Sequence, residues 1–325
     1  FLPEDLPISI LNRLKASEGQ WLDFKSFFLP ANQMMSDLEK LQQAGAIIDT
    51  NGHQVRLVHW PDRLHPDELS WELGTKLIGR KIQVYEQTAS TNDIAWRLLE
   101  SGEPEGAAIF AESQTGGRGR LGHAWHDAPG KSILVSLLLT PRLPLEHIQV
   151  LTVFSAVALC EAILELTGHS PTIKWPNDVI FKNRKVAGIL VETRSSENQA
   201  PSGFVLGIGI NVNQCAEDFP PDLRESAASL RSVLGDAFER SALARALLKR
   251  LDHHYHRVCA EEYDDLESSW RNLCAAGGQP IRLEYERKEF TGRIVDIDLM
   301  DGIILQLPNG ALKTFRAEHV TVLPI

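Results

Sequence analysis

Cysteine is scarce in this 325-residue sequence, which contains only Cys160, Cys215, Cys259 and Cys274. No two of them form a CxxC pair, and no set of cysteines and histidines has the spacing of a zinc finger. A histidine cluster at positions 253, 254 and 256 also lacks the HExxH pattern of zinc peptidases. We therefore expect free thiols in a reducing compartment, a cytoplasmic location and no metal site built from the protein.

The sequence also lacks a surplus of positive charge and any long apolar run. Its 33 basic and 43 acidic residues give a formal net charge of −10, whereas dedicated nucleic-acid-binding proteins usually carry a basic surplus. No stretch approaches the run of about 20 apolar residues that spans a bilayer. The longest apolar patch, Ile133 to Leu139, is interrupted by Ser136 and suits a buried strand. We expect a globular protein that makes no membrane contact.

The length predicts more than one domain, and the pattern divides the chain into three regions: 1–65, 66–275 and 276–325. In the first region, apolar residues at 34, 35, 38 and 41 follow a helical period, and Gly45 ends the run. Asn51-Gly52 then separates two apolar runs, which is a strong hairpin signal. This order of helices and hairpin resembles a winged helix-turn-helix.

The other two regions differ in their element pattern. The middle region alternates strand-like runs (107–111, 132–139, 186–193, 204–211) with helix-like runs (92–100, 148–166, 242–263). This predicts an α+β domain with a mixed sheet. The last region has four short strand-like runs, punctuated by Asp301-Gly302 and Asn309-Gly310, and this spacing predicts a small barrel of the SH3 type.

The stretch from Gln114 to Trp125 is the most informative, because it combines four glycines with Arg118 and Arg120. Glycines let backbone N–H groups approach an anion, and arginines supply bidentate cationic donors. Such a loop suits a phosphate, although an exposed flexible loop explains the same composition equally well. It is not a P-loop, because Lys-Ser/Thr does not follow the glycines at the required spacing.

Two further stretches carry polar residues at the ends of predicted strands. The sequence KWPND (174–178) forms a turn before a short strand, and Lys185 opens the next strand. This hairpin brings Lys174, Asp178 and Lys185 to one end of a sheet, where a lysine either binds an anion or is simply solvated. In GIGINVN (207–213), alternating glycines leave room for a ligand or another backbone to come close.

Together, these stretches resemble the biotin–protein ligase family. Ser90-Thr91-Asn92, the GGRGRxGxxW loop, KWPND with its RKVAGIL continuation, and GIGINVN occur in the order and approximate spacing of that family. Ala228-Ser229-Leu230 is similar to a Thr-Ser-Leu-type element of the family, and the resemblance covers residues 85–325. Residues 1–65 resemble, in degenerate form, the DNA-binding domain of bifunctional members. The implied fold is a winged-helix-like domain, a mixed-sheet ligase domain and an SH3-like barrel.

The resemblance implies a role for each matching residue. The contacts to biotin would come from Ser90, Thr91, Asn92, Gln114, Arg118, Gly119, Arg120 and Lys185. The residues of the chemical steps would be Arg118, Arg120, Lys185 and Asp178. Trp125 and Asn211 would lie on the nucleotide side. His123 departs from the family, which usually has arginine there, so a cation of the loop is replaced by a side chain that is largely neutral at pH 7.

The implied reaction joins biotin to ATP and then transfers biotin to a lysine of a biotin carboxyl carrier protein. Two anions must meet, so the cations at 118, 120 and 185 would offset their repulsion. Mg²⁺ would neutralise the β- and γ-phosphates, and Asp178 would position the acceptor lysine or remove its proton. The resemblance also allows a homodimer.

Two alternatives remain beside this reading. A lipoate–protein ligase shares the fold but not the GGRGRxGxxW pattern. A biotin-responsive DNA-binding repressor is the second, either as an additional or as the sole function. Against DNA binding, residues 30–45 contain Lys40 as their only basic residue, and residues 1–65 have six basic against eight acidic residues. A winged-helix relic or a protein-contact module is the favoured interpretation of this region, and DNA binding stays open.

Overall fold

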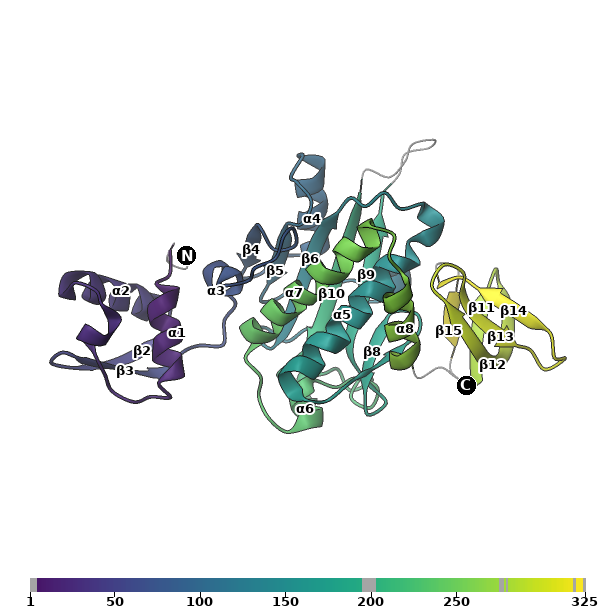
Figure 1. The fold of residues 1–325 in the computed structure, drawn as a ribbon. Coiled ribbons are helices and arrows are strands. Elements are labelled where there is room, and N and C mark those ends of the chain that lie inside the picture. Colours follow the sequence, from purple (N-terminus) through teal and green to yellow (C-terminus); the bar gives the residue numbers. More distant parts are fainter. Residues whose placement is uncertain (1–4, 195–202, 275–277, 279, 318–319, 324–325) are drawn as a thin grey trace. The chain divides into compact units, whose positions relative to one another are not determined.

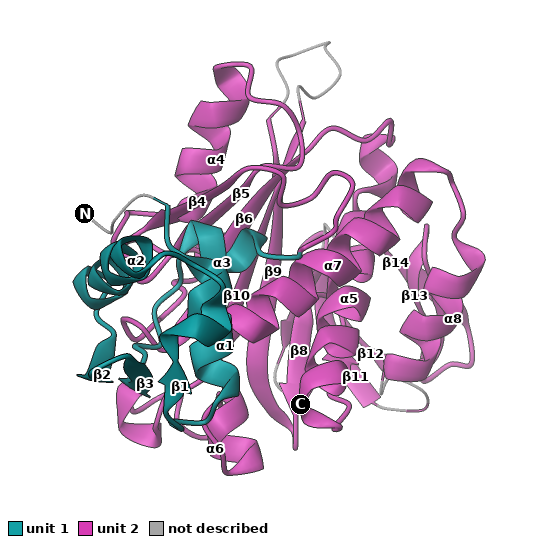
Figure 2. Cartoon of the chain, turned by 60° about the vertical axis from the view of Figure 1, so that its left-hand side comes forward, with its two compact units in different colours: residues 1–72 teal, residues 73–325 magenta. Residues whose placement is uncertain are grey.

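The structure is a computed structural model that describes residues 5–194, 203–274, 278, 280–317 and 320–323. The chain divides into two compact units, residues 1–72 and residues 73–325 (Figure 2). Each unit has its own helices and its own sheet, so we describe them separately.

The first unit combines helices with a small sheet. Its elements are α1 (Ile8–Ala16), β1 (Leu22–Asp23), η1 (Phe24–Phe27), α2 (Ala31–Gln43), β2 (Ile47–Asn51), β3 (Gln54–His59) and α3 (Pro66–Ser70). Strand β3 lies between β1 and β2 in an antiparallel sheet. The helix and the hairpin expected from the sequence are both present, and Gly52 takes the positive φ of +60° that the tight turn needs.

Helices α1 and α2 each bury an apolar face against the hairpin. Leu11 and Leu14 of α1 meet Met34 and Leu41 of α2 in a core that also contains Val55 of β3. Helix α3 is held to α1 by an ion pair of 2.5 Å between Lys15 and the buried carboxylate of Glu68. α3 is therefore part of the first compact unit.

The second unit is built around a seven-stranded mixed sheet with the order β4-β5-β6-β10-β9-β8-β7. The strands are β4 (Ile82–Tyr85), β5 (Ala108–Ala111), β6 (Ser132–Leu139), β7 (Thr172–Lys174), β8 (Asp178–Phe181), β9 (Arg184–Thr193) and β10 (Phe204–Asn211). Only β4 and β5 pair in parallel, while the other neighbours are antiparallel. The predicted α+β class with a central mixed sheet is confirmed.

Helices pack against this sheet and against one another. They are α4 (Thr91–Glu100), α5 (Gln149–Thr167), α6 (Leu230–Leu234), α7 (Arg240–Cys259) and α8 (Asp264–Leu273), with short 3₁₀ turns η2 (Arg120–Gly122), η3 (Leu145–His147) and η4 (Ala216–Asp218). Figure 1 shows α5 and α7 running side by side across the sheet. Their contact includes the rings of Phe154 and Tyr255, with centroids 5.9 Å apart.

The segment Leu145–Thr167, which contains α5, is long and apolar enough to cross a membrane by length and composition. The sequence pattern had indicated Ile133–Leu139 as the longest apolar patch, and this longer apolar segment corrects that prediction. However, 67% of its most apolar window is buried inside the protein, between α7 and the sheet. This burial is typical of the core helix of a soluble protein.

The C-terminal part of the second unit is a small antiparallel β domain. It contains β11 (Pro280–Tyr285), β12 (Lys288–Asp298), β13 (Gly302–Gln306), β14 (Leu312–Phe315) and β15 (Val320–Leu323), in the order β14-β13-β12-β11-β15. Phe315 is fully buried at its centre, in edge contact with Tyr285 and Phe290. Strand β15 also reaches the wall of the cavity described next.

Candidate active site

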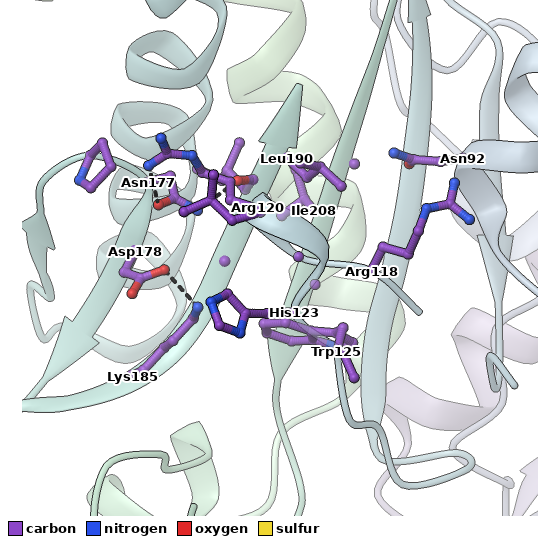
Figure 3. A pocket seen from close by; sticks show the side chains of 18 of the residues that line it. Asn92, Arg118, Arg120, His123, Trp125, Asn177, Asp178, Lys185, Leu190 and Ile208 are labelled. Atoms are coloured by element: carbon purple, nitrogen blue, oxygen red, sulfur yellow. Dashed lines mark hydrogen bonds and ion pairs between the residues drawn. The ribbon is translucent and has the colours of Figure 1, made fainter. Parts of the chain in front are cut away.

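A cavity of about 550 Å³ opens beside the central sheet. Its walls come from the start of α4, the loop after β5, the β7–β8 turn, strands β9 and β10, and β15 (Figure 3). All the stretches that the sequence singled out as chemically informative therefore meet at one place.

The glycine-arginine loop (residues 112–131) folds back on itself as a narrow hairpin. Backbone N–H groups of Trp125, Gly119 and Gly130 donate to the carbonyl oxygens of Gly117 (2.9 Å), His123 (2.7 Å) and Glu112 (3.1 Å), respectively. A side chain at 117 would place its Cβ 2.9 Å from the Trp125 carbonyl oxygen, so this rung requires glycine. The sequence predicted no regular structure here, because the cross-strand pairing follows no hydrophobic period.

Glycines form the floor of the cavity, where β9 and β10 pair Gly188 with Gly209. A Cβ at Gly209 would lie 2.5 Å from Cε2 of Trp125, and one at Gly188 would lie 3.0 Å from Cζ3 of the same ring. A Cβ at Gly207 would lie 2.5 Å from Oδ1 of Asn92. The alternation of glycines predicted a close approach, and the groups that approach are these two side chains.

Lys185 and Asp178 face each other at one end of the cavity. Lys185 Nζ lies 2.6 Å from Asp178 Oδ1 and 5.5 Å from the centroid of the Trp125 ring. The β8–β9 hairpin causes this arrangement, as its spacing predicted. His123 lines the same cavity as this pair.

Arg118 points away from this pair, towards α4 (Figure 3). Its guanidinium donates to both carboxylate oxygens of Asp93, at 2.6 and 3.2 Å, and lies 3.6 Å from Glu192. These hydrogen bonds from Arg118 hold the pKa of the Asp93 carboxyl below its usual value. The positive charge of Arg118 is thus compensated by two acidic residues in this structure.

Arg120 links the loop to two other parts of the site. It donates to the carbonyl oxygen of Ala317 at 2.5 Å, to that of Val320 at 3.4 Å, and to Asn177 Oδ1 at 3.4 Å. The neighbouring Gly119 also lines the cavity. The C-terminal β domain therefore contacts the glycine-arginine loop through an arginine that the sequence singled out.

A cluster of polar side chains closes the opposite end of the cavity. Gln114 Oε1 accepts hydrogen bonds from the backbone N–H (2.7 Å) and the hydroxyl (3.0 Å) of Thr91. The buried Ser136 hydroxyl joins the oxygens of Thr91 (2.7 Å) and Asn92 (2.5 Å), and Asn92 donates to Glu192 at 3.0 Å. Ser90 is the N-cap residue of α4, but its side chain makes no capping hydrogen bond.

The sequence reading differs from this geometry in a few residues. Asn211 is not one of the described residues that line the cavity. It is buried, and its side-chain oxygen accepts a hydrogen bond from Gln214 at 3.0 Å. Conversely, the reading missed Asp93, Glu192 and Ser136, which arrange the arginine and the polar cluster. No local pattern marks them, because their partners are 25 to 100 residues away in sequence.

Together, the fold and the site define an α+β protein with a cavity that combines a glycine floor, a polar cluster and several cationic side chains. The profile of the biotin/lipoate A/B protein ligase family matches residues 84–211. The bifunctional ligase/repressor BirA of Bacillus subtilis is 30% identical over 282 residues, which are 86% of each chain. The biotin--[acetyl-CoA-carboxylase] ligase of Mycobacterium tuberculosis is 33% identical over 59% of this chain and 72% of its own.

A solved structure agrees with these relatives. The biotin protein ligase from Aquifex aeolicus in complex with biotin and ATP superposes with a TM-score of 0.66 and 27% identity, over 75% of this chain and 99% of its own. The chain belongs to the biotin/lipoate A/B protein ligase family. The family resemblance predicted from the sequence is confirmed.

Proposed function

We propose that this protein is a biotin–protein ligase that uses biotin and ATP to biotinylate a biotin carboxyl carrier protein. The observation that carries the proposal is the shared cavity: a glycine floor, a polar cluster at one end and the Lys185–Asp178 pair at the other. Its length and its two different ends suit a small bicyclic ligand with a carboxylate tail. The relatives are named as ligases of biotin, and the Aquifex structure contains biotin and ATP.

The polar cluster would bind the ring system of biotin. Ser90, Thr91, Asn92 and Gln114 present hydroxyl and amide groups of both donor and acceptor type. These groups suit a cyclic urea, which has one acceptor oxygen and two N–H donors. The glycines at 207 and 209 let Asn92 and Trp125 lie close to β10, so the ligand would lie against these two side chains.

The cations would act where biotin and ATP meet. Lys185 would contact the biotin carboxylate and the α-phosphate, while Arg118, Gly119 and Arg120 would close over both ligands. Preorganised donors stabilise the charge that develops on the α-phosphate as the carboxylate attacks and pyrophosphate leaves. Trp125 would contact the nucleotide. Asn211 would act on the nucleotide side only indirectly, because it does not line the cavity.

The second step transfers the biotinyl group. The ε-amine of the acceptor lysine attacks the activated acyl carbon, and AMP leaves. Asp178 would accept the proton of that amine or orient it, because its carboxylate already lies within 2.6 Å of an ammonium group in this structure. The closed loop would keep water away from the mixed anhydride.

Mg²⁺ would enter with the nucleotide as part of the substrate. Within the described ranges, no group of three or more histidine, cysteine or acidic side chains could hold a metal ion. We therefore assign the ion to the β- and γ-phosphates of ATP, and we assign no step to a metal bound only by the protein.

The decisive experiment is incubation of the full chain with biotin, ATP–Mg²⁺ and a biotin carboxyl carrier domain, read by streptavidin blot. We expect ATP-dependent labelling of the carrier. A parallel reaction with lipoate tests the alternative. Pyrophosphate release with lipoate but none with biotin would refute the proposal.

The remaining assignments are proposals that depend on the sequence. We propose three regions (1–65, 66–275 and 276–325), with a winged-helix-like first region and an SH3-like last region. Compact packing groups residues up to Glu72 with the first. We also propose a cytoplasmic protein, since its four cysteines are free, and a homodimer, which sedimentation can test.

DNA binding is the alternative function of the first unit. The Bacillus relative named a ligase/repressor aligns over 86% of this chain, which favours testing it. However, helix α2 has Lys40 as its only basic residue, and phosphate contacts normally come from arginine or lysine. We expect no salt-sensitive shift of duplex DNA by this protein with biotin and ATP; a sequence-specific shift would make the repressor reading correct.

A further inference from the structure

Asp127 lies in the returning strand of the glycine-arginine loop, and neither the sequence motifs nor the reaction assigned it a role. Both of its carboxylate oxygens accept from the backbone N–H of Gln114, at 3.3 and 3.4 Å. Asp127 thus forms a rung of the hairpin with its side chain, between the backbone rungs at Glu112–Gly130 and Gly117–Trp125.

The residue that Asp127 holds is the one that bridges the loop to α4. Gln114 Oε1 receives two hydrogen bonds from Thr91, and Thr91 is joined to the buried Ser136. Asp127 helps to hold the backbone of Gln114, which also pairs with Thr88 in a short parallel bridge, and so helps to place the Gln114 side chain beside Thr91. A chain of hydrogen bonds therefore runs from Asp127 through Gln114 to Thr91 and the floor of the cavity.

We propose that Asp127 is a positioning residue for biotin, which acts by fixing Gln114 against Thr91 at the ring end of the cavity. This inference rests on the proposed contact of Gln114 with biotin. Asp127 itself touches no substrate in this scheme. Its effect should therefore appear in the affinity for biotin, with little effect on the rate of the chemical step once both substrates are bound.

The charge state of Asp127 supplies a readout that a structural role alone would not. Burial raises the pKa of this carboxyl, and the hydrogen bond from the Gln114 backbone and the neighbouring His126 oppose that rise. Protonation converts the carboxylate into a weaker acceptor, so biotin affinity should fall as the pH falls through this raised pKa.

The effect of pH on stability has the opposite sign. A carboxyl whose pKa is higher in the folded than in the unfolded state binds its proton more tightly when folded. Protonation of Asp127 therefore favours folding as the pH falls. A positioning role therefore predicts that biotin affinity falls at low pH while the contribution of Asp127 to stability does not. A purely structural role would not separate these two effects.

The test measures biotin binding to the full chain by calorimetry from neutral pH down to the lowest pH at which the protein stays folded, with thermal unfolding of each variant. Asp127→Ala should weaken biotin binding about tenfold, equivalent to about 1.4 kcal/mol. Asp127→Asn keeps one acceptor oxygen, so it should restore most of the affinity and remove the decline at low pH. Asp222→Ala, at an exposed position outside the site, is the matched control and should bind biotin like the parent.

Gln114→Ala separates this inference from the assignment on which it rests. We expect Gln114→Ala to weaken biotin binding, and Asp127→Ala to add little in that background. If Gln114→Ala weakens binding but Asp127→Ala does not, Asp127 is not a positioning residue, and the role of Gln114 stands. If Gln114→Ala has no effect, both assignments are wrong. Equal losses in Asp127→Ala and Asp127→Asn, together with a lowered Tm, would show a structural role and overturn the inference.

Discussion

Substitution of Gly209 by alanine tests whether the glycine floor and Trp125 work together. A Cβ at this position would lie 2.5, 2.6 and 2.9 Å from three atoms of the Trp125 indole. Gly209 is not among the glycines with positive φ, so the added methyl group does not strain the backbone. The steric conflict with the indole is therefore the main consequence of the substitution.

The distances set the size of the expected effect. Ordinary carbon–carbon contacts begin near about 3.5 Å, so the indole must move by roughly 1 Å. Inserting a methyl group into a packed site typically costs about 1–3 kcal/mol. Since the proposed role of Trp125 is to contact the nucleotide, we expect adenylation efficiency to fall by about 5- to 150-fold, at 1.36 kcal/mol for each factor of ten. The loop can absorb the movement, so the fold should persist.

The assay is pyrophosphate release with biotin and ATP, measured beside thermal unfolding of the same protein. A Trp125→Ala background supplies the control, because the methyl group of Gly209→Ala has no indole to meet there. We expect the second substitution to add little in that background. If Gly209→Ala lowers the rate equally with and without the indole, or has no effect in the parent, the steric reasoning is refuted.

Three further substitutions test the charged groups. Arg118→Ala should weaken biotin retention and adenylate yield by about 1.5–3 kcal/mol, the value of a charge-assisted hydrogen bond; unchanged biotin affinity and yield would make Arg118 a surface residue. Lys185→Ala should lose about 2.7–4 kcal/mol of transition-state stabilisation, measured by single-turnover pyrophosphate release, with little change in Tm. Full activity of this variant would show that Lys185 is not part of the site. The fully buried Arg240 lies 2.6 Å from the carboxylate of Glu112. Arg240→Leu removes this cation, so it should lower the free energy of unfolding in denaturant by about 3–5 kcal/mol. A loss below about 1 kcal/mol would contradict this prediction.

Local sequence patterns predicted the parts of this protein that depend on local geometry. The Lys174–Lys185 segment contains a turn between short strands, and the structure pairs Lys174 with Asp178 across β7 and β8. The Lys185–Asp178 ion pair follows from this hairpin spacing. Likewise, the alternation of Gly207 and Gly209 in one strand places both on the same face of the sheet. Periodicity and turn chemistry contain this information.

The contacts between distant segments could not be predicted in the same way. Glu192 meets Asn92 and Trp96 across about 100 residues, and Arg240 meets Glu112 across 128. Nothing in the neighbourhood of these residues specifies the partner, because the contact depends on how α4, β9 and α7 pack. The orientation of the Arg118 side chain could not be predicted for the same reason, because it depends on its contacts with Asp93 and Glu192.

Three of the cations that line the site have partners within the protein. Arg118 is paired with Asp93 and Glu192, Arg120 donates to backbone carbonyl oxygens, and Lys185 is paired with Asp178. A ligand can therefore bind each of these cations only by displacing its present partner, so we expect only a strongly charged anion to bind favourably. A carboxylate or phosphate meets this condition because charged acceptors bind these donors more strongly than neutral ones do. Such an exchange would change only the partners of the arginine side chains, because the rungs of the hairpin are made by backbone groups.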